Sequence, residues 1–246
     1  MVLVIPIDMD SKNRKIRIME KEKNVWELIK SNHFEEASIV ADEQYSLTKD
    51  ISILNNKVFA LLQLQRYSDV IELCDTIIHK TDGETDVDFI LSGIAFWALD
   101  NKSKAIEYWT KGEKAKYADI AGGIDVLIFQ YFASVKLNDD KLLLTVKKKM
   151  KKLLKNKIAT NFYGLQGNYL LDEITETELY SSVTMTNILR ERQLCCLDFV
   201  LGIKKLESSN LDFYKKKLTD CISYGANAYL EHFFYLAKVE LNMGSL

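Results

Sequence analysis

Three short stretches of similar pattern recur through the first half of the chain. Each lies where one amphipathic segment ends and the next begins, and each carries a small residue at the same place, Ala37, Val70 or Ala105. These residues are 33 and then 35 positions apart (70 − 37 and 105 − 70). A period near 34 residues accommodates two helices and a turn, and such pairs stack because no single pair can bury its apolar face alone. The spacing therefore predicts an all-α array of stacked helix pairs.

The order of large and small residues within these units resembles the tetratricopeptide repeat, in which small residues lie where two helices cross and bulky residues fill the next unit. The third unit carries the pattern at Phe89, Gly93, Phe96, Ala105, Trp109 and Gly112. The second carries it at Leu54, Val58, Leu61, Tyr67, Val70, Cys74 and Ile77. This resemblance implies a right-handed α-solenoid over residues 21–243, with regular repeats at about 51–115 and divergent helix pairs at 123–243.

The apolar periodicity also predicts where the helices lie. The expected ranges are 24–32, 34–47, 51–65, 67–80, 86–100, 102–115, 123–137, 141–155, 159–171, a helix capped by Thr175 and Glu178, 187–207, 211–224 and 228–243. We expect the last helix to close the exposed end of the array with Glu231, Lys238 and Glu240 on a polar face. Residues 1–20 are β-rich around a turn-like cluster and predict a small hairpin cap. Residues 244–246 are interpreted as a cloning remnant.

Composition narrows the class of function. The net charge of −2 disfavours a dedicated nucleic-acid-binding protein, and no apolar run is long enough to insert into a membrane. Four cysteines without CxxC spacing are typical of reduced core residues in a cytoplasmic protein. The three histidines are far apart and are expected on the surface, so we expect no metal, no cofactor and no catalytic residues. An enzyme on a helical toroid stays an alternative that convergent carboxylates in a deep pocket would favour.

Repeat geometry indicates a first set of candidate binding residues. The groove-lining position, eleven residues before each small residue, holds Trp26, Phe59 and Ile94, and Asn55 and Trp97 lie nearby on the same helices. Large aromatic side chains in a groove are able to anchor a partner helix or peptide. The equally weighted alternative is that a tightly wound array, or the hairpin at 1–20, covers these residues.

A second set of candidates is charged. Residues 136–157 hold nine lysines and two aspartates, and we single out Lys147, Lys148, Lys151 and Lys152 as a docking face for an acidic partner. The lysines lack accompanying aromatic and arginine residues, which disfavours RNA. Residues 158–189 hold four acids and no basic residue, and Asp172, Glu173 and Glu176 form an acidic counterpart. For the lysines, the simpler interpretation is a solvated helix face. For the acids, it is the start of a helix, where the helix dipole favours acidic residues.

Most of residues 24–241 also resembles a group of bacterial tetratricopeptide-like proteins, some of them encoded beside polymorphic or contact-dependent toxins. The segments that carry the resemblance are Trp26 with Leu28, 88–97, 105–109, 116–123, 170–179 and 190–195 leading into Phe199 and Gly202. The resemblance implies a protein partner and a cytoplasmic immunity protein that neutralises a cognate toxin by occlusion. The alternatives are a peptide-responsive regulator and a general adaptor or scaffold.

Overall fold

A computed structural model describes residues 24–118, 121–155 and 161–243. These residues form α-helices joined by short turns, one 3-10 helix (η2), and no β-strand. The hairpin predicted for residues 1–20 and the remnant at 244–246 lie outside the described residues. The helices are α2 (Val25–Lys30), α3 (Phe34–Thr48), α4 (Ile51–Gln63), α5 (Tyr67–Thr81), α6 (Asp86–Ala98), α7 (Lys102–Gly112), α8 (Ile124–Lys136), α9 (Asp140–Leu153), α10 (Phe162–Leu170), α11 (Glu176–Ser181), α12 (Asn187–Glu207), α13 (Leu211–Ser223), η2 (Gly225–Ala228) and α14 (His232–Met243).

Local capping chemistry sets many of these boundaries. The predicted capping box is confirmed at α11, where the Thr175 hydroxyl accepts from the Glu178 backbone and the Glu178 carboxylate accepts from the Thr175 backbone. The side chains of Asn24 and Asp50 cap α2 and α4 in the simpler way. Such side chains satisfy backbone N–H groups that have no partner within the helix, and this explains why the predicted ends agree closely with the observed ones.

Consecutive helices pack against one another along the first half of the chain, from α2 to α9. The three small residues that define the period, Ala37, Val70 and Ala105, are completely buried. Gly93 shows why small residues are required at such crossings, because a Cβ atom there would lie 2.1 Å from Nε1 of Trp109 on the partner helix α7. The sequence pattern thus corresponds to close helix crossings.

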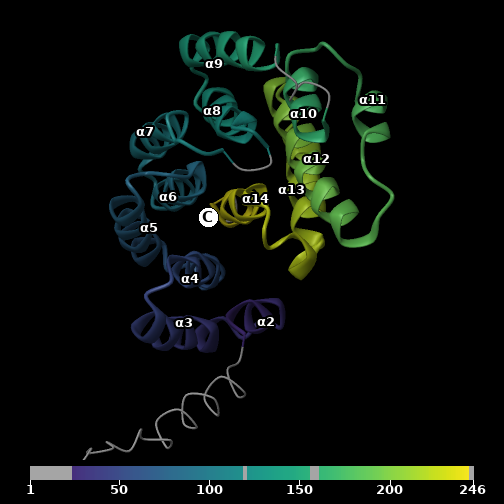
Figure 1. Cartoon of the computed structure of the whole chain (residues 1–246). Helices are drawn as coiled ribbons and strands as arrows, with labels where there is room; N and C mark the ends of the chain where they lie inside the picture. Colours follow the sequence, from purple (N-terminus) through teal and green to yellow (C-terminus); the bar gives the residue numbers. More distant parts are fainter. Residues whose placement is uncertain (1–23, 119–120, 156–160, 244–246) are drawn as a thin grey trace, which may run out of the picture.

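The last helix, α14, lies on the inner side of the curve that α4 to α9 describe (Figure 1). It packs against α6, α12 and α13. The predicted polar outer face is therefore wrong. Glu231 and Glu240 are only 7% and 6% exposed, and Lys238 Nζ donates to Gln63 Oε1 at 2.8 Å. These side chains pack among other helices, and each charged group has a hydrogen-bond partner within the protein in place of the solvent that was expected.

An aromatic core joins the two halves of the chain. Trp109 of α7 stacks on Phe129 of α8 with ring centroids 5.3 Å apart, and Phe129 contacts Phe233 of α14 at 4.9 Å. Phe132 of α8 lies 5.8 Å from Phe199 of α12, and these five side chains are buried. Each fully buried aromatic ring contributes roughly 2–3 kcal/mol by removal of apolar area from water. This shared core places the C-terminal helices firmly against the first half.

Candidate functional site

The predicted groove positions are filled by the chain itself. Ile94 and Trp97 are completely buried, and Phe59 is buried against Tyr235 of α14 with ring centroids 5.8 Å apart. Trp26 is partly exposed and meets Phe59 edge to face at 6.0 Å. Of the two sequence-based interpretations, the structure shows the one in which the array covers these side chains. A docking groove formed by Ile94 and Trp97 is therefore not what the structure presents.

Polar contacts hold α14 in this position. Trp97 Nε1 donates to Glu240 Oε1 at 2.7 Å, and the Tyr214 hydroxyl donates to Glu240 Oε2 at 2.9 Å. Lys136 Nζ forms an ion pair with the same oxygen at 2.6 Å. Asn55, the remaining groove candidate, is half-buried, and its Oδ1 atom has no hydrogen-bond partner within the described part of the chain. Both oxygens of the Glu240 carboxylate are thus occupied on the inner face.

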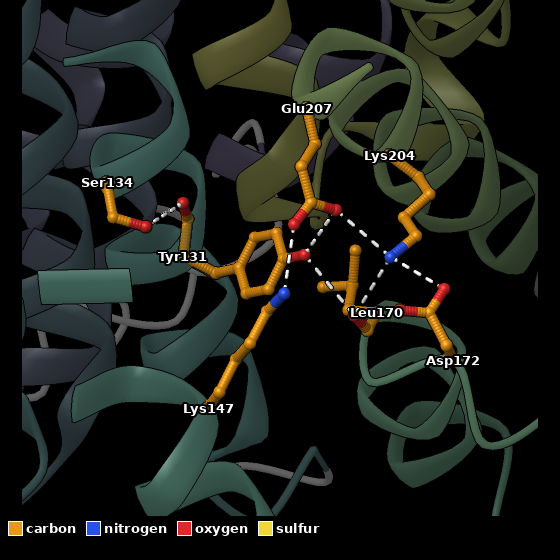
Figure 2. Close-up of polar contacts among 7 residues, drawn as sticks. All are labelled: Tyr131, Ser134, Lys147, Leu170, Asp172, Lys204 and Glu207. Atoms are coloured by element: carbon orange, nitrogen blue, oxygen red, sulfur yellow. Dashed lines mark hydrogen bonds and ion pairs between the residues drawn. The ribbon is translucent and has the colours of Figure 1, made fainter. Parts of the chain in front are cut away.

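The two charged candidate sets meet in one network, shown in Figure 2. Lys147 Nζ of α9 donates to Glu207 Oε1 of α12 at 2.9 Å, and the Tyr131 hydroxyl of α8 donates to Glu207 Oε2 at 2.8 Å. Lys204 Nζ lies 3.0 Å from Glu207 Oε2 and 2.8 Å from Asp172 Oδ1. Burial opposes ionisation of Glu207, but the hydrogen bonds from Lys147, Tyr131 and Lys204 lower its pKa.

Several charged candidates are therefore engaged inside the molecule. Lys147 and Asp172 belong to the network around Glu207, and Lys151 Nζ lies 3.9 Å from Glu173 Oε1. Glu176 is half-buried in the first turn of α11, where the helix dipole favours an acid. The acidic set is partly neutralised by neighbouring lysines, which leaves the other side of α9 as the strongly charged surface.

One face of α9 carries exposed basic side chains. Lys141, Leu144, Lys148 and Lys152 follow one another at helical spacing, and Lys155 continues the row just beyond the helix; we call these five residues the basic stripe. All five are exposed, Leu144 by 57%. Within residues 24–118, 121–155 and 161–243, no carboxylate lies within 4.0 Å of these four lysine Nζ atoms. Val146 and Met150 on the opposite face of α9 are buried.

The basic stripe borders a surface pocket of about 610 Å³. The pocket lies between the end of α7, the turn before α8 and the end of α9. Its lining residues are Asp86, Gly112, Glu113, Ala115, Ala118, Gly122, Gly123, Leu127, Lys149, Lys152, Leu153 and Lys155. Lys149 is paired with Glu113 at 2.6 Å, whereas Lys152 and Lys155 bring the positive charge of the stripe to the pocket wall.

A second cavity, of about 240 Å³, lies where the two halves of the chain meet. It is lined by Phe59, Val87, Ala121, Asp125, Tyr163, Arg192, Cys196, Leu230, Glu231, His232 and Phe233. We call it the central cavity. Most of its exposed lining is apolar, and its polar groups come from α8, α10, α12 and the start of α14.

Four polar groups of the central cavity form two pairs. His232 Nδ1 lies 3.3 Å from Asp125 Oδ2, and Arg192 Nε donates to Glu231 Oε1. The Cys196 thiol donates to Glu231 Oε2 at 3.0 Å, and burial raises the pKa of that thiol well above its usual range. His232 was expected on the surface, and this prediction is wrong because α14 packs against α6, α12 and α13, which leaves His232 buried.

Two carboxylates in one cavity meet the condition that would favour an enzyme. Both Glu231 oxygens are occupied, by Arg192 and by Cys196, and Asp125 Oδ1 accepts from the Val126 backbone N–H at 3.0 Å. Carboxylates held in this way are suited to binding and to holding charge. A general acid–base pair requires instead that each carboxylate be within hydrogen-bond reach of a transferred proton.

The sequence offered only weak signals for the central cavity. Asp125, Arg192 and His232 are far apart along the chain, and their spacing matches no catalytic or metal-binding pattern. Within the described residues, no group of three or more histidine, cysteine, aspartate or glutamate side chains is arranged to hold a metal ion. The one usable sequence signal was the presence of charged residues in otherwise apolar helices, because a charged side chain that is buried requires a partner.

Fold and surface together define an all-α protein of successive helix pairs with one strongly basic helix face. No protein-family model matches the chain, and no curated protein matches it either. In the part of the chain that the structure describes, no helix has the length and apolar character needed to cross a membrane.

Proposed function

We propose that this protein is a non-enzymatic interaction module, a tetratricopeptide-like solenoid whose partner is a protein with an acidic surface. The basic stripe on α9 is the observation that carries this proposal. The inner face of the array is occupied by α14, so a partner meets the outer surface of the molecule. The same occupation leaves little room for a peptide in the groove and disfavours the peptide-responsive regulator.

Electrostatics support the choice of an acidic partner. The chain as a whole carries a net charge of −2, yet the stripe gathers four lysines on one helix face, none with a carboxylate partner among the described residues. A local field of one sign steers a partner of opposite sign and raises its association rate. Leu144 adds an exposed apolar contact in the middle of the lysines, and the pocket beside Lys152 and Lys155 offers a recess for an acidic side chain.

The resemblance noted in the sequence narrows the partner further. We infer that the partner is a bacterial toxin domain and that binding neutralises the toxin by covering its active surface. The stripe is a convex helix face, which fits occlusion of a surface better than capture of an extended chain. Nucleic acid is the less favoured occupant because the stripe contains no arginine and no aromatic residue to stack on bases.

The test measures binding of the neighbouring gene's product by calorimetry, using the full chain and a double charge reversal, Lys148→Glu with Lys152→Glu. The matched control is Lys215→Glu with Lys216→Glu, two exposed lysines on α13. We expect at least a tenfold loss of affinity for the stripe variant, a small change for the control, and weaker binding of the native protein at high salt.

Equal effects of the two double variants would reject the stripe as the docking face. Binding of single-stranded RNA with comparable affinity would reject the choice of a protein partner. A partner that binds through the stripe but shows no toxicity would reject the immunity role and retain the interaction role.

A further inference from the structure

The central cavity carries an inference that is independent of the basic stripe. Its walls come from both halves of the chain, with Phe59 of α4 and Val87 of α6 on one side and Arg192 of α12 and Phe233 of α14 on the other. Arg192 is partly exposed and Leu230 is 38% exposed at its edge, whereas Asp125 and His232 are buried. The cavity therefore runs from a solvent-accessible mouth to a polar floor.

Charge at this floor is unbalanced. Asp125 and Glu231, which are both buried, contribute two carboxylates. Arg192 is the permanent cation among the lining residues, and the His232 imidazole faces Asp125, so the two lining carboxylates outnumber the permanent cation by two to one. A buried excess of negative charge is costly in a low-dielectric interior, and a bound cation reduces that cost.

The other residues that line the cavity favour a ligand with an apolar body. Phe59, Tyr163 and Phe233 provide aromatic surface, and Val87 and Leu230 provide aliphatic surface. A cavity of roughly 150 Å³ already holds a benzene ring, so the 240 Å³ here accommodates a ring with a short side chain. Aromatic faces also attract cations through their quadrupole.

We propose that the central cavity binds a small organic cation, an ammonium group on an aromatic body, with the ammonium against Asp125 and Glu231. Each carboxylate oxygen has two lone pairs, so Asp125 and Glu231 retain acceptor capacity beyond their present partners. A ligand in this place contacts α4, α6, α8, α12 and α14 at once and stabilises the packing of α14 against the first half.

The test uses three phenylalkyl probes of similar size and different charge, which are 2-phenylethylammonium, 2-phenylethanol and 3-phenylpropionate, at a pH where the amine is charged. Calorimetric titration of the full chain is expected to show one saturable site for the ammonium, weaker binding of the alcohol and the weakest for the carboxylate. Saturating ammonium is expected to raise the unfolding temperature by about 2–4 °C, because only the folded state holds the site.

Two variants test the location. Asp125→Asn keeps the shape and removes one charge, and it is expected to weaken ammonium binding at least fivefold while changing binding of the alcohol little. Val87→Phe fills the cavity and is expected to weaken binding of both probes. Amide NMR of the native protein supplies a measurement that needs no variant, with shifts expected at Val87, His232 and Phe233.

Several results would overturn the proposal. These are tighter binding of 3-phenylpropionate than of the amine, no saturable binding of the amine, or ammonium-induced NMR shifts outside the cavity. The Lys148→Glu, Lys152→Glu protein serves as the control that separates the two proposals. It is expected to bind the amine as the native protein does, whatever its affinity for an acidic partner.

Discussion

Trp97 and Glu240 are 143 residues apart in the sequence, yet the indole nitrogen of Trp97 donates to the Glu240 carboxylate at 2.7 Å. This contact ties α6 in the first half to α14 at the end of the described chain. The same carboxylate also accepts from Tyr214 and pairs with Lys136. The buried carboxylate of Glu240 thus connects four helices, α6, α8, α13 and α14.

Glu240→Gln is predicted to destabilise the fold. The neutral amide cannot match the charge of Lys136, and its NH₂ group opposes at least one of the three donors. We expect a loss of about 2–3 kcal/mol in the free energy of unfolding, below the full cost of breaking a buried pair because Lys136 is partly exposed. Denaturant unfolding checks this. Glu43→Gln, at an exposed carboxylate of α3, is the control and should change stability by less than about 0.5 kcal/mol.

Gly93→Ala is predicted to disturb the α6–α7 crossing. The new Cβ would lie 2.1 Å from Trp109 Nε1, and Trp109 is completely buried and therefore unable to move aside. We expect a loss of about 3 kcal/mol, at the upper end of the range for overpacking. Gly202→Ala is the comparison, because its Cβ would lie 3.3 Å from Lys217 Cβ. Equal thermal stability of the two variants would contradict the close-crossing explanation.

Asp88 is predicted to make stability depend on pH. Burial raises the pKa of this carboxyl from 3.8 to about 6, although the hydrogen bond from Thr85 and the proximity of His232 act in the opposite direction. The folded state therefore holds the proton more tightly than the unfolded chain does. The stabilisation by this group is complete below pH 3.8 and is lost as the pH rises to about 6, by roughly 2–3 kcal/mol.

Asp88→Asn removes this titration, and unfolding measured from pH 4 to pH 7 should show a flatter profile than the native protein over that window. Asp212→Asn, at an exposed aspartate of α13, should leave the profile unchanged. Identical profiles for native protein and Asp88→Asn would show that the Asp88 carboxyl titrates as it does in the unfolded chain.

The four cysteines, all within the described residues, are predicted to react slowly with thiol reagents in the native protein. Cys74, Cys195, Cys196 and Cys221 are buried free thiols, and burial raises the pKa of each. A thiol reacts as the thiolate, so both access and ionisation are suppressed. Ellman's reagent at neutral pH should label less than one thiol per chain in minutes, and four after denaturation. Rapid labelling of Cys196 would instead indicate solvent entry through the central cavity.

The helices were largely predictable because their signals are local. Asn187–Glu207 was predicted with both ends correct, and the capping box at Thr175 was recognised from two residue types at the right spacing. The small residues at the helix crossings were also identified, since Gly93 admits a neighbouring helix only because it lacks a Cβ. Each of these features depends on residues within a few turns of one another.

The position of α14 was not predictable in the same way. Glu231 and Glu240 look like residues of a solvated face, and only their partners Arg192 and Trp97, distant in sequence, make burial favourable. The central cavity was missed for the same reason, because Asp125 and His232 meet only after α14 has packed inside the curve. Likewise, the lysines of α9 looked uniform in sequence, but in the structure Lys147 pairs with Glu207, whereas Lys148 is exposed and has no carboxylate within 4.0 Å among the described residues.

The central position of the final described helix has a consequence for biosynthesis. While the ribosome is still making α12 and α13, α14 is not yet available to pack against Phe59 of α4 and against α6. The long separation between these contacts also slows their formation, since chain closure must precede any gain from packing. During that interval part of the future apolar core of the nascent chain is still uncovered, and a chaperone or an early-arriving partner has its best opportunity to bind it.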